Sequence, residues 1–104
     1  MTRDQIEAVW KAIGTVERTV RAAGVDAAPV LRLHHSGTHF DCIVWEAVDD
    51  ATTVIRAQGT TPAGQVFIAV DAITAVGIIA WFDAMNERYI RDIDAIVVEA
   101  KARR

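Results

Sequence analysis

The sequence predicts an α+β fold in which two amphipathic helices flank a small, strongly bent, five-stranded antiparallel barrel. Apolar residues recur at helical spacing near both ends of the chain, whereas from Pro29 the pattern changes to strict alternation. The expected strands are short and are joined mostly by tight turns, which favours a small barrel over a sandwich. The chain has 104 residues, the size of one domain. We divide this single domain into a helix over 3–23, a barrel over 29–80 and a helix over 81–101.

The first helix begins at a capping signal and ends at a glycine. Thr2 followed by Gln5 fits a capping box, in which the two side chains satisfy two backbone N–H groups at the start of a helix. Gly24 can adopt the left-handed conformation that ends many helices. The apolar stripe between them consists of Ile6, Val9, Trp10, Ile13, Val16 and Val20.

The segment "LRLHHSGTHFDC" (31–42) predicts a β-hairpin with Ser36 and Gly37 as a two-residue turn. This turn fixes the pairing, so that Arg32 faces Asp41 and His34 faces His39 across the hairpin. One face is then apolar and belongs to the core, with Leu31, Leu33, Phe40, Cys42 and Val44. The other face is polar, and together with Trp45, which alternates to the same side, it is the predicted binding surface: Arg32, His34, His39, Asp41 and Trp45.

The remaining strands are expected at 52–57, 65–70 and 73–79. A turn at Asp49 and Asp50 precedes the first of them, and a loop of turn-forming residues over 59–64 follows it. The last two strands meet at a sharp bend at Asp71 and Ala72. We expect the barrel interior to be filled by Leu31, Leu33, Phe40, Val44, Val54, Phe67 or its neighbours, and Ile73.

The residues over 81–101 show a second helical stripe, which includes Ile93, Ile96 and Ala100. Two helices of this length present more apolar surface than a small barrel can cover. A long exposed apolar stripe is unusual on a monomer, so we expect a homo-oligomer. The residues expected at its interface are Trp10, Trp81, Phe82, Met85 and Tyr89.

The composition is that of a globular protein, with 52% hydrophobic and 24% charged residues. Cys42 is the only cysteine, so an internal disulfide is excluded and a reducing cytoplasm is the expected compartment. Strand alternation places Cys42 on the apolar face, where a thiol is unreactive. No apolar run approaches the ~18 residues of a membrane span, and no catalytic or phosphate-binding motif is present. We therefore expect no membrane partner, no cofactor and no enzymatic activity.

The order of these elements resembles the Sm-like family, and its bacterial Hfq branch in particular. The matching pieces are an N-terminal helix, "VLRLHH", Gly37 in the first hairpin turn, the long bent strand "THFDCIVWEAVDD", "TTVIRA" and "QVFIAVDAITAV". The last piece contains Ala72–Val76, "AITAV", where Hfq-like proteins have Ala-Ile-Ser and a valine. The resemblance covers roughly residues 5–80 and implies a ring-forming Sm-like or SH3-like barrel.

The departures from that family bear on RNA binding. Hfq-like proteins hold uridine-rich RNA with a Lys-His dipeptide where this chain has Val70 and Asp71. The formal net charge of -3 lies entirely in the barrel segment, so the positive charge that supplies most nonspecific RNA affinity is missing. Nucleic acid is therefore an unfavoured partner.

The preferred function is a non-catalytic oligomeric binding or assembly module, whose partner is an unidentified protein or small molecule. One alternative is an Sm-like RNA-binding protein. The other is a metal-binding protein that uses His34, His39 and Asp41, since two imidazoles and a carboxylate form a plausible ligand set. We do not assign a metal, because a solvated hairpin face explains the same three residues.

Overall fold

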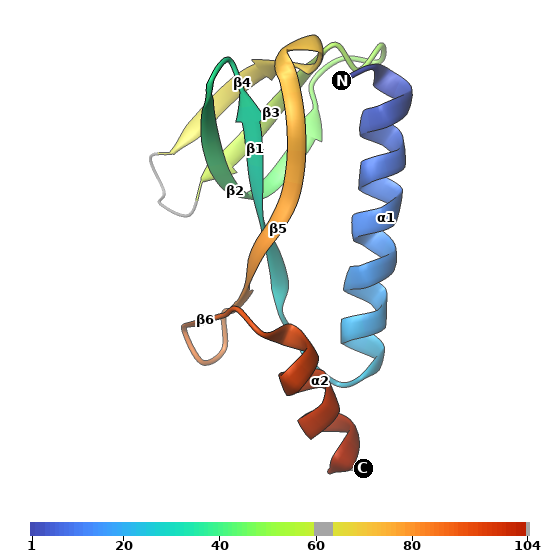
Figure 1. The fold of residues 1–104 in the computed structure, drawn as a ribbon, viewed down its shortest axis with the longest axis vertical. Helices are drawn as coiled ribbons and strands as arrows, with labels where there is room; N and C mark the ends of the chain where they lie inside the picture. Colours follow the sequence, from blue (N-terminus) through green and yellow to red (C-terminus); the bar gives the residue numbers. More distant parts are fainter. Residues whose placement is uncertain (60–63, 104) are drawn as a thin grey trace.

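The computed structural model describes residues 1–59 and 64–103, so the predicted loop over 59–64 lies mostly outside the described residues. The elements follow the chain from the N-terminal helix to the C-terminal helix (Figure 1). They are α1 Arg3–Ala22, β1 Ala28–His35, β2 Thr38–Ala47, β3 Val54–Gly59, β4 Gln65–Ala69, a 3₁₀ turn Val70–Ala72, β5 Ile73–Asp83, β6 Arg88–Ile90 and α2 Ile93–Ala102.

The strands form one antiparallel sheet in the order β4-β3-β2-β1-β5-β6. The α+β class is confirmed, but the sheet has six strands instead of the predicted five and it is not closed. Among the described residues, no pairing joins β4 to β5. β1 and β5 continue past the other strands as a twisted ribbon, and β6 and α2 lie at its far end (Figure 1).

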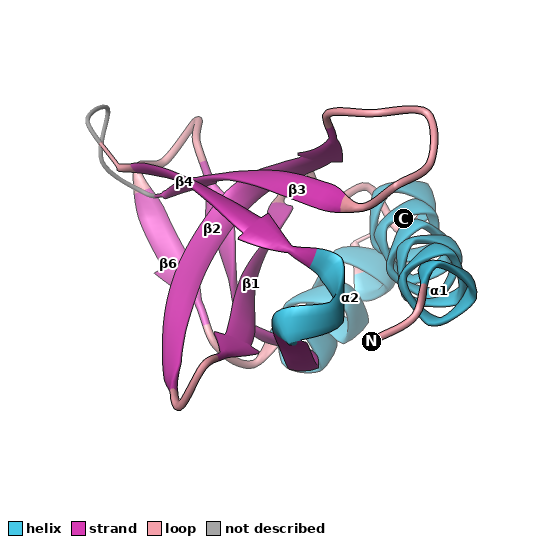
Figure 2. Ribbon diagram, turned by 90° about the horizontal axis from the view of Figure 1, so that it is seen from above, coloured by secondary structure: helices cyan, strands magenta, loops and turns pink. Residues whose placement is uncertain are grey.

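Helix α1 begins and ends as the sequence predicts. The Thr2 hydroxyl accepts from the Gln5 backbone N–H and the Gln5 side chain accepts from the Thr2 N–H, which completes the capping box. Gly24 has a φ of 89°, the left-handed conformation that glycine adopts without a Cβ clash. The helix runs along one side of the sheet, and Ile6 is fully buried there (Figure 2).

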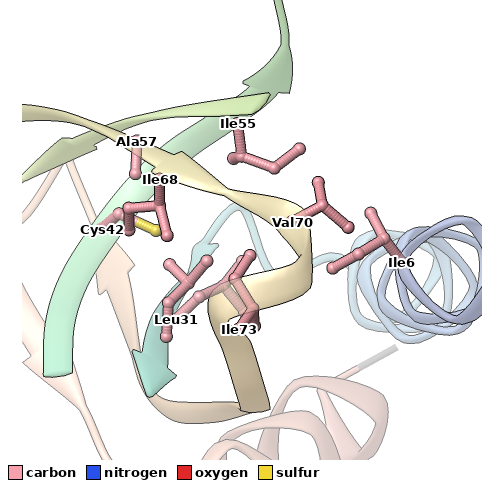
Figure 3. Packing of buried hydrophobic residues seen from close by; sticks show 9 residues of the cluster. Ile6, Leu31, Cys42, Ile55, Ala57, Ile68, Val70 and Ile73 are labelled. Atoms are coloured by element: carbon pink, nitrogen blue, oxygen red, sulfur yellow. The ribbon is translucent and has the colours of Figure 1, made fainter. Parts of the chain in front are cut away.

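The main core lies inside the curve of the sheet, and Ile6 of α1 closes it at one end. Figure 3 shows Ile6 pointing from α1 toward Val70 and Ile73, at the bend between β4 and β5. Leu31 and Leu33 are buried from β1, as predicted. The buried cluster consists of Ile6, Leu31, Leu33, Cys42, Ile55, Ala57, Ile68, Val70 and Ile73.

Val44 was predicted in the core but lies outside it, and of the choice between Phe67 and its neighbours the structure selects a neighbour. Val44 is 54% exposed because a register shift between Cys42 and Val44 inserts an extra residue into β2 and reverses its alternation. Phe67 is 61% exposed, whereas its neighbour Ile68 supplies the core contact of β4. The β2 bulge also determines where Trp45 points.

The predicted helix over 81–101 is wrong in its first half. Trp81, Phe82 and Asp83 continue β5, a turn follows, β6 returns antiparallel to β5, and only then does α2 begin. The Asp83 carboxylate holds the turn, because it accepts from the Asn86 backbone N–H and side-chain amide and from Arg88 Nε. The Asp92 side chain caps α2 by accepting from the Ala95 N–H.

A second, smaller core holds the end of the ribbon against both helices. Trp81 is 3% exposed and packs with Val20 of α1 and Ile90 of β6. One side of α2 completes this cluster, although none of its residues is fully buried. The partly buried members are Val25, Ala27, Ile78, Ile93, Ile96 and Val97. No helix in the described part of the chain is both long and apolar enough to cross a membrane.

Candidate functional site

The β1–β2 hairpin forms with the predicted pairing. Arg32 lies opposite Asp41 and His34 lies opposite His39. Ser36 and Gly37 have φ values of 49° and 76°, as the tight turn between two antiparallel strands requires. Because Leu31 and Leu33 face the core, alternation places Arg32 and His34 on the opposite face of the sheet, which we call the outer face.

Arg32 and Asp41 form a two-point ion pair on the outer face. Arg32 Nε donates to Asp41 Oδ1 over 2.8 Å, and Arg32 Nη2 donates to Asp41 Oδ2 over 3.0 Å. These hydrogen bonds lower the pKa of Asp41, and partial burial opposes that shift only in part. The pair therefore stays charged at neutral pH and holds the guanidinium in a fixed plane.

The His34 and His39 rings lie beside this ion pair, with centroids 5.9 Å apart. Both oxygens of the Asp41 carboxylate accept hydrogen bonds from Arg32, so this carboxylate does not form a common ligand group with the two imidazole rings. In the chain as described, no group of three or more His, Cys, Asp or Glu side chains is placed to hold a metal ion. The ligand set His34, His39 and Asp41 is therefore not assembled.

Next to the ion pair, the outer face is hollowed into a groove of about 470 Å³. Its floor is apolar, and one wall is the Arg32–Asp41 pair. The other wall comes from β6 and the residue after it. The lining residues are Val30, Arg32, Asp41, Ile79, Ala80, Tyr89 and Arg91; we call this hollow the outer groove.

Only three of the predicted site residues line the outer groove. Arg32 and Asp41 were expected on a binding surface and Tyr89 at an oligomer interface, yet the fold brings them together because β6 returns alongside β5. Tyr89 is 56% exposed and its ring lies 5.0 Å from that of Phe82. Arg91 was missed, because no local pattern distinguishes it from the other charged residues near the C-terminus.

The three tryptophans all have contacts within the chain, and the predicted side of Trp45 is wrong. Trp45, expected on the binding surface, is turned by the β2 bulge toward α1, where its ring meets Trp10 edge-on at a centroid distance of 5.2 Å. Trp81 is buried in the second core. Trp10 and Trp81, both expected at an oligomer interface, thus each have contacts within the chain, and the interface itself stays a prediction. Met85, in contrast, is 84% exposed in the turn before β6.

Cys42 is fully buried on the apolar face, as predicted. Burial raises the pKa of its thiol to about 12, because the thiolate would lose its hydration, and the charge of Asp41 adds to the shift. A thiol with this pKa stays protonated at neutral pH and is a poor nucleophile.

Two segments of the sheet have free edges. β4 has a strand partner only on its β3 side, and β5 pairs with β6 only from Trp81 onward, so within the described residues the edge over 73–80 lacks a strand partner. Neither β4, "QVFIA", nor the edge segment of β5, "ITAVGIIA", contains a charged residue or a proline. Charged residues and proline are two of the features by which monomeric proteins prevent strand pairing between chains, and both edges lack them. The edge of β5 does carry two register shifts against β1, so it is not a regular strand over its whole length.

The ion pair predicts a specific dependence of stability on pH. The pKa of Asp41 is lower in the folded chain than its unfolded value of about 3.9, so its contribution is complete above that value and is lost as the pH falls through the folded pKa. Urea unfolding of the wild type and Asp41→Asn at several pH values should therefore show their stability difference shrinking below pH ~4. Both side chains are about one-third exposed, so the effect should be small.

The control for this pH effect is Asp41→Asn in a chain that lacks the Arg32 guanidinium. In an Arg32→Gln background, Asp41→Asn should leave the pH dependence of unfolding nearly unchanged, because the hydrogen bonds that lower the pKa are already lost. An equal pH effect of Asp41→Asn in both backgrounds would contradict the assignment of the shift to Arg32.

The comparisons with known proteins give no match: no protein-family model fits the chain, and no curated protein or solved structure is significantly similar to it.

Proposed function

We propose that the chain is a non-catalytic binding or assembly module that works as a homo-oligomer, in which β4 of one copy pairs with the free edge of β5 in the next. The observation that carries the proposal is the pair of uncharged edges in one sheet, neither of which has a strand partner among the described residues. β4 has five residues and the free segment of β5 has eight, so each edge is long enough for several backbone hydrogen bonds.

Exposed side chains along these edges favour the same contact. Phe67, at the centre of β4, is 61% exposed, although it would be expected in a core. On β5, a Cβ added at Gly77 would meet no atom within 4 Å, so the sheet face at this strand is open next to the free edge. Because the contact joins two different edges, it is head-to-tail, and repeated copies form a ring if the rotation closes.

The support for this oligomer comes from the two free edges and not from the aromatic residues that the sequence predicts at an interface. Trp10 and Trp81 pack within the chain, and the C-terminal helix is shorter than predicted. The Sm-like resemblance supports a ring-forming scaffold, and the lone buried Cys42 is compatible with a reducing cytoplasm.

Light scattering coupled to size exclusion tests the proposal. The wild type should elute with the mass of several chains, and Phe67→Lys should elute as a monomer, because a charge at the centre of an edge strand opposes pairing between chains. Val98→Lys is the matched control, since Val98 is 67% exposed but lies on α2, away from both edges. A monomeric wild type, or a Phe67→Lys variant with the wild-type mass, would overturn the proposal.

RNA binding by such a ring is the alternative that the Sm-like resemblance suggests. Val70 stands at one position of the Lys-His dipeptide that holds RNA in that family, and it is only 4% exposed in the main core. Asp71, at the other position, adds negative charge. Oligo-U added before the same light-scattering run should therefore leave the mass unchanged even at low salt, and a mass increase that salt abolishes would favour the RNA alternative.

A further inference from the structure

The outer groove has the features of a small-molecule site. Its volume of about 470 Å³ lies within the range of ligand pockets in proteins. Val30 is 3% exposed and Ala80 is 9% exposed, and together with Ile79 they give the groove an apolar floor. Charged and aromatic groups surround this floor, so an apolar body and a polar group could be held at once.

The two arginines of the groove differ in how they are engaged. Arg32 uses Nε and Nη2 to bind Asp41, and that carboxylate neutralises its charge. Arg91 has no hydrogen bond or ion pair with any residue that the structure describes. A guanidinium with all five N–H donors available can bind a carboxylate through two parallel hydrogen bonds.

The charges that line the groove select the sign and size of the ligand charge. Arg32 and Arg91 carry two positive charges and Asp41 one negative charge, so the groove has an excess of one positive charge although the whole chain is negative. One negative charge on a ligand balances this excess. A dianion such as a phosphate monoester would bring its second charge close to Asp41 and be repelled.

The aromatic wall favours a flat ligand body. The Tyr89 ring is held against Phe82 at a centroid distance of 5.0 Å, yet Tyr89 remains 56% exposed. An aromatic face that is both fixed and exposed can stack on another ring without losing much side-chain freedom. Beneath it, the floor of Val30, Ile79 and Ala80 can take up the remaining apolar surface.

We propose that the outer groove binds small aromatic carboxylates, with the carboxylate on Arg91 and the ring between Tyr89 and the apolar floor. Asp41 holds Arg32 in place as the opposite wall and excludes ligands of higher negative charge. This inference does not depend on the oligomeric state, because all seven lining residues belong to one chain.

Titration of the ¹⁵N-labelled full chain with 2-naphthoate, followed by NMR, tests the proposal. The amide shifts should change over 30–32, at 41, over 79–80 and over 89–91, which are the parts of the chain that line the groove. The neutral analogue 2-naphthalenemethanol should bind at least about tenfold more weakly, because it cannot form a charge-assisted pair with Arg91.

Variants of Arg91 distinguish a specific pair between its guanidinium and the ligand carboxylate from nonspecific attraction of the anion to positive charges on the chain. Arg91→Gln should weaken 2-naphthoate binding by at least about tenfold, and Arg91→Lys should weaken it less, since it keeps the charge but loses the two-point geometry. Arg18→Gln makes the same charge change on α1 and should bind like the wild type. Equal affinity for acid and alcohol, wild-type affinity in Arg91→Gln, or shifts confined to other segments would overturn the proposal.

Discussion

Trp81→Ala is expected to lower the free energy of unfolding by about 3–5 kcal/mol. Trp81 is 3% exposed and packs with Val20 and Ile90, so its removal leaves a cavity between the ribbon, α1 and α2. Because the second core is small, α2 should lose most of its support together with the indole. Urea unfolding measured by far-UV circular dichroism gives the free energy, and amide exchange of residues 93–102 reports on α2.

Met85→Ala is the control, because the sequence places both residues at an oligomer interface and the fold separates them. Met85 is 84% exposed in the turn before β6, so its truncation should change the free energy of unfolding by less than about 0.5 kcal/mol. Unfolding should be compared at several protein concentrations. A Trp81→Ala loss that appears only at concentrations where the wild type is oligomeric would contradict burial within one chain.

Ile6→Ala is expected to lower the free energy of unfolding by about 2–5 kcal/mol. Ile6 has no exposed surface and contacts the bend between β4 and β5, so the truncated side chain leaves a cavity under the part of the sheet that holds Val70 and Ile73. Alanine favours the helix itself, and the loss therefore reports on docking of α1 and not on helix formation. Equilibrium urea unfolding followed by tryptophan fluorescence measures it.

Val16→Ala provides the comparison on the same helix. Val16 belongs to the same predicted stripe, but it is 42% exposed, so its truncation should leave stability within about 0.5 kcal/mol of the wild type. Similar losses for the two variants would show that Val16 is buried as well, for instance against a second chain, and would contradict its exposure in the single chain.

The sequence was informative wherever neighbouring residues decide the structure. The pairing of Arg32 with Asp41 and of His34 with His39 follows from a two-residue turn and a period of two, and the observed register is identical to the predicted one. The bounds of α1 follow from a capping box and Gly24, both of which act within a few residues. The burial of Cys42 follows from the same strand alternation.

The sequence was misleading where two local patterns coexist. Helical spacing is shown by four apolar residues of this segment, Trp81, Phe82, Met85 and Tyr89. Asp83 and Asn86, between them, are residues that favour turns. The buried contact of Trp81 with Ile90 stabilises the hairpin over the helix. An Asp92 cap at the true start of α2 is the signal that could have located this helix.

By itself, the sequence determined the α+β class, the first helix and the hairpin with its ion pair, because caps, turns and alternation act over short separations. The tertiary structure alone decided that the sheet stays open, that a bulge turns Trp45 onto Trp10, and that β6 returns beside β5. It also brought Tyr89 and Arg91 to a groove with Arg32, residues more than fifty positions apart. The proximity of these residues depends on how the strands pack in three dimensions, which no local sequence pattern predicts.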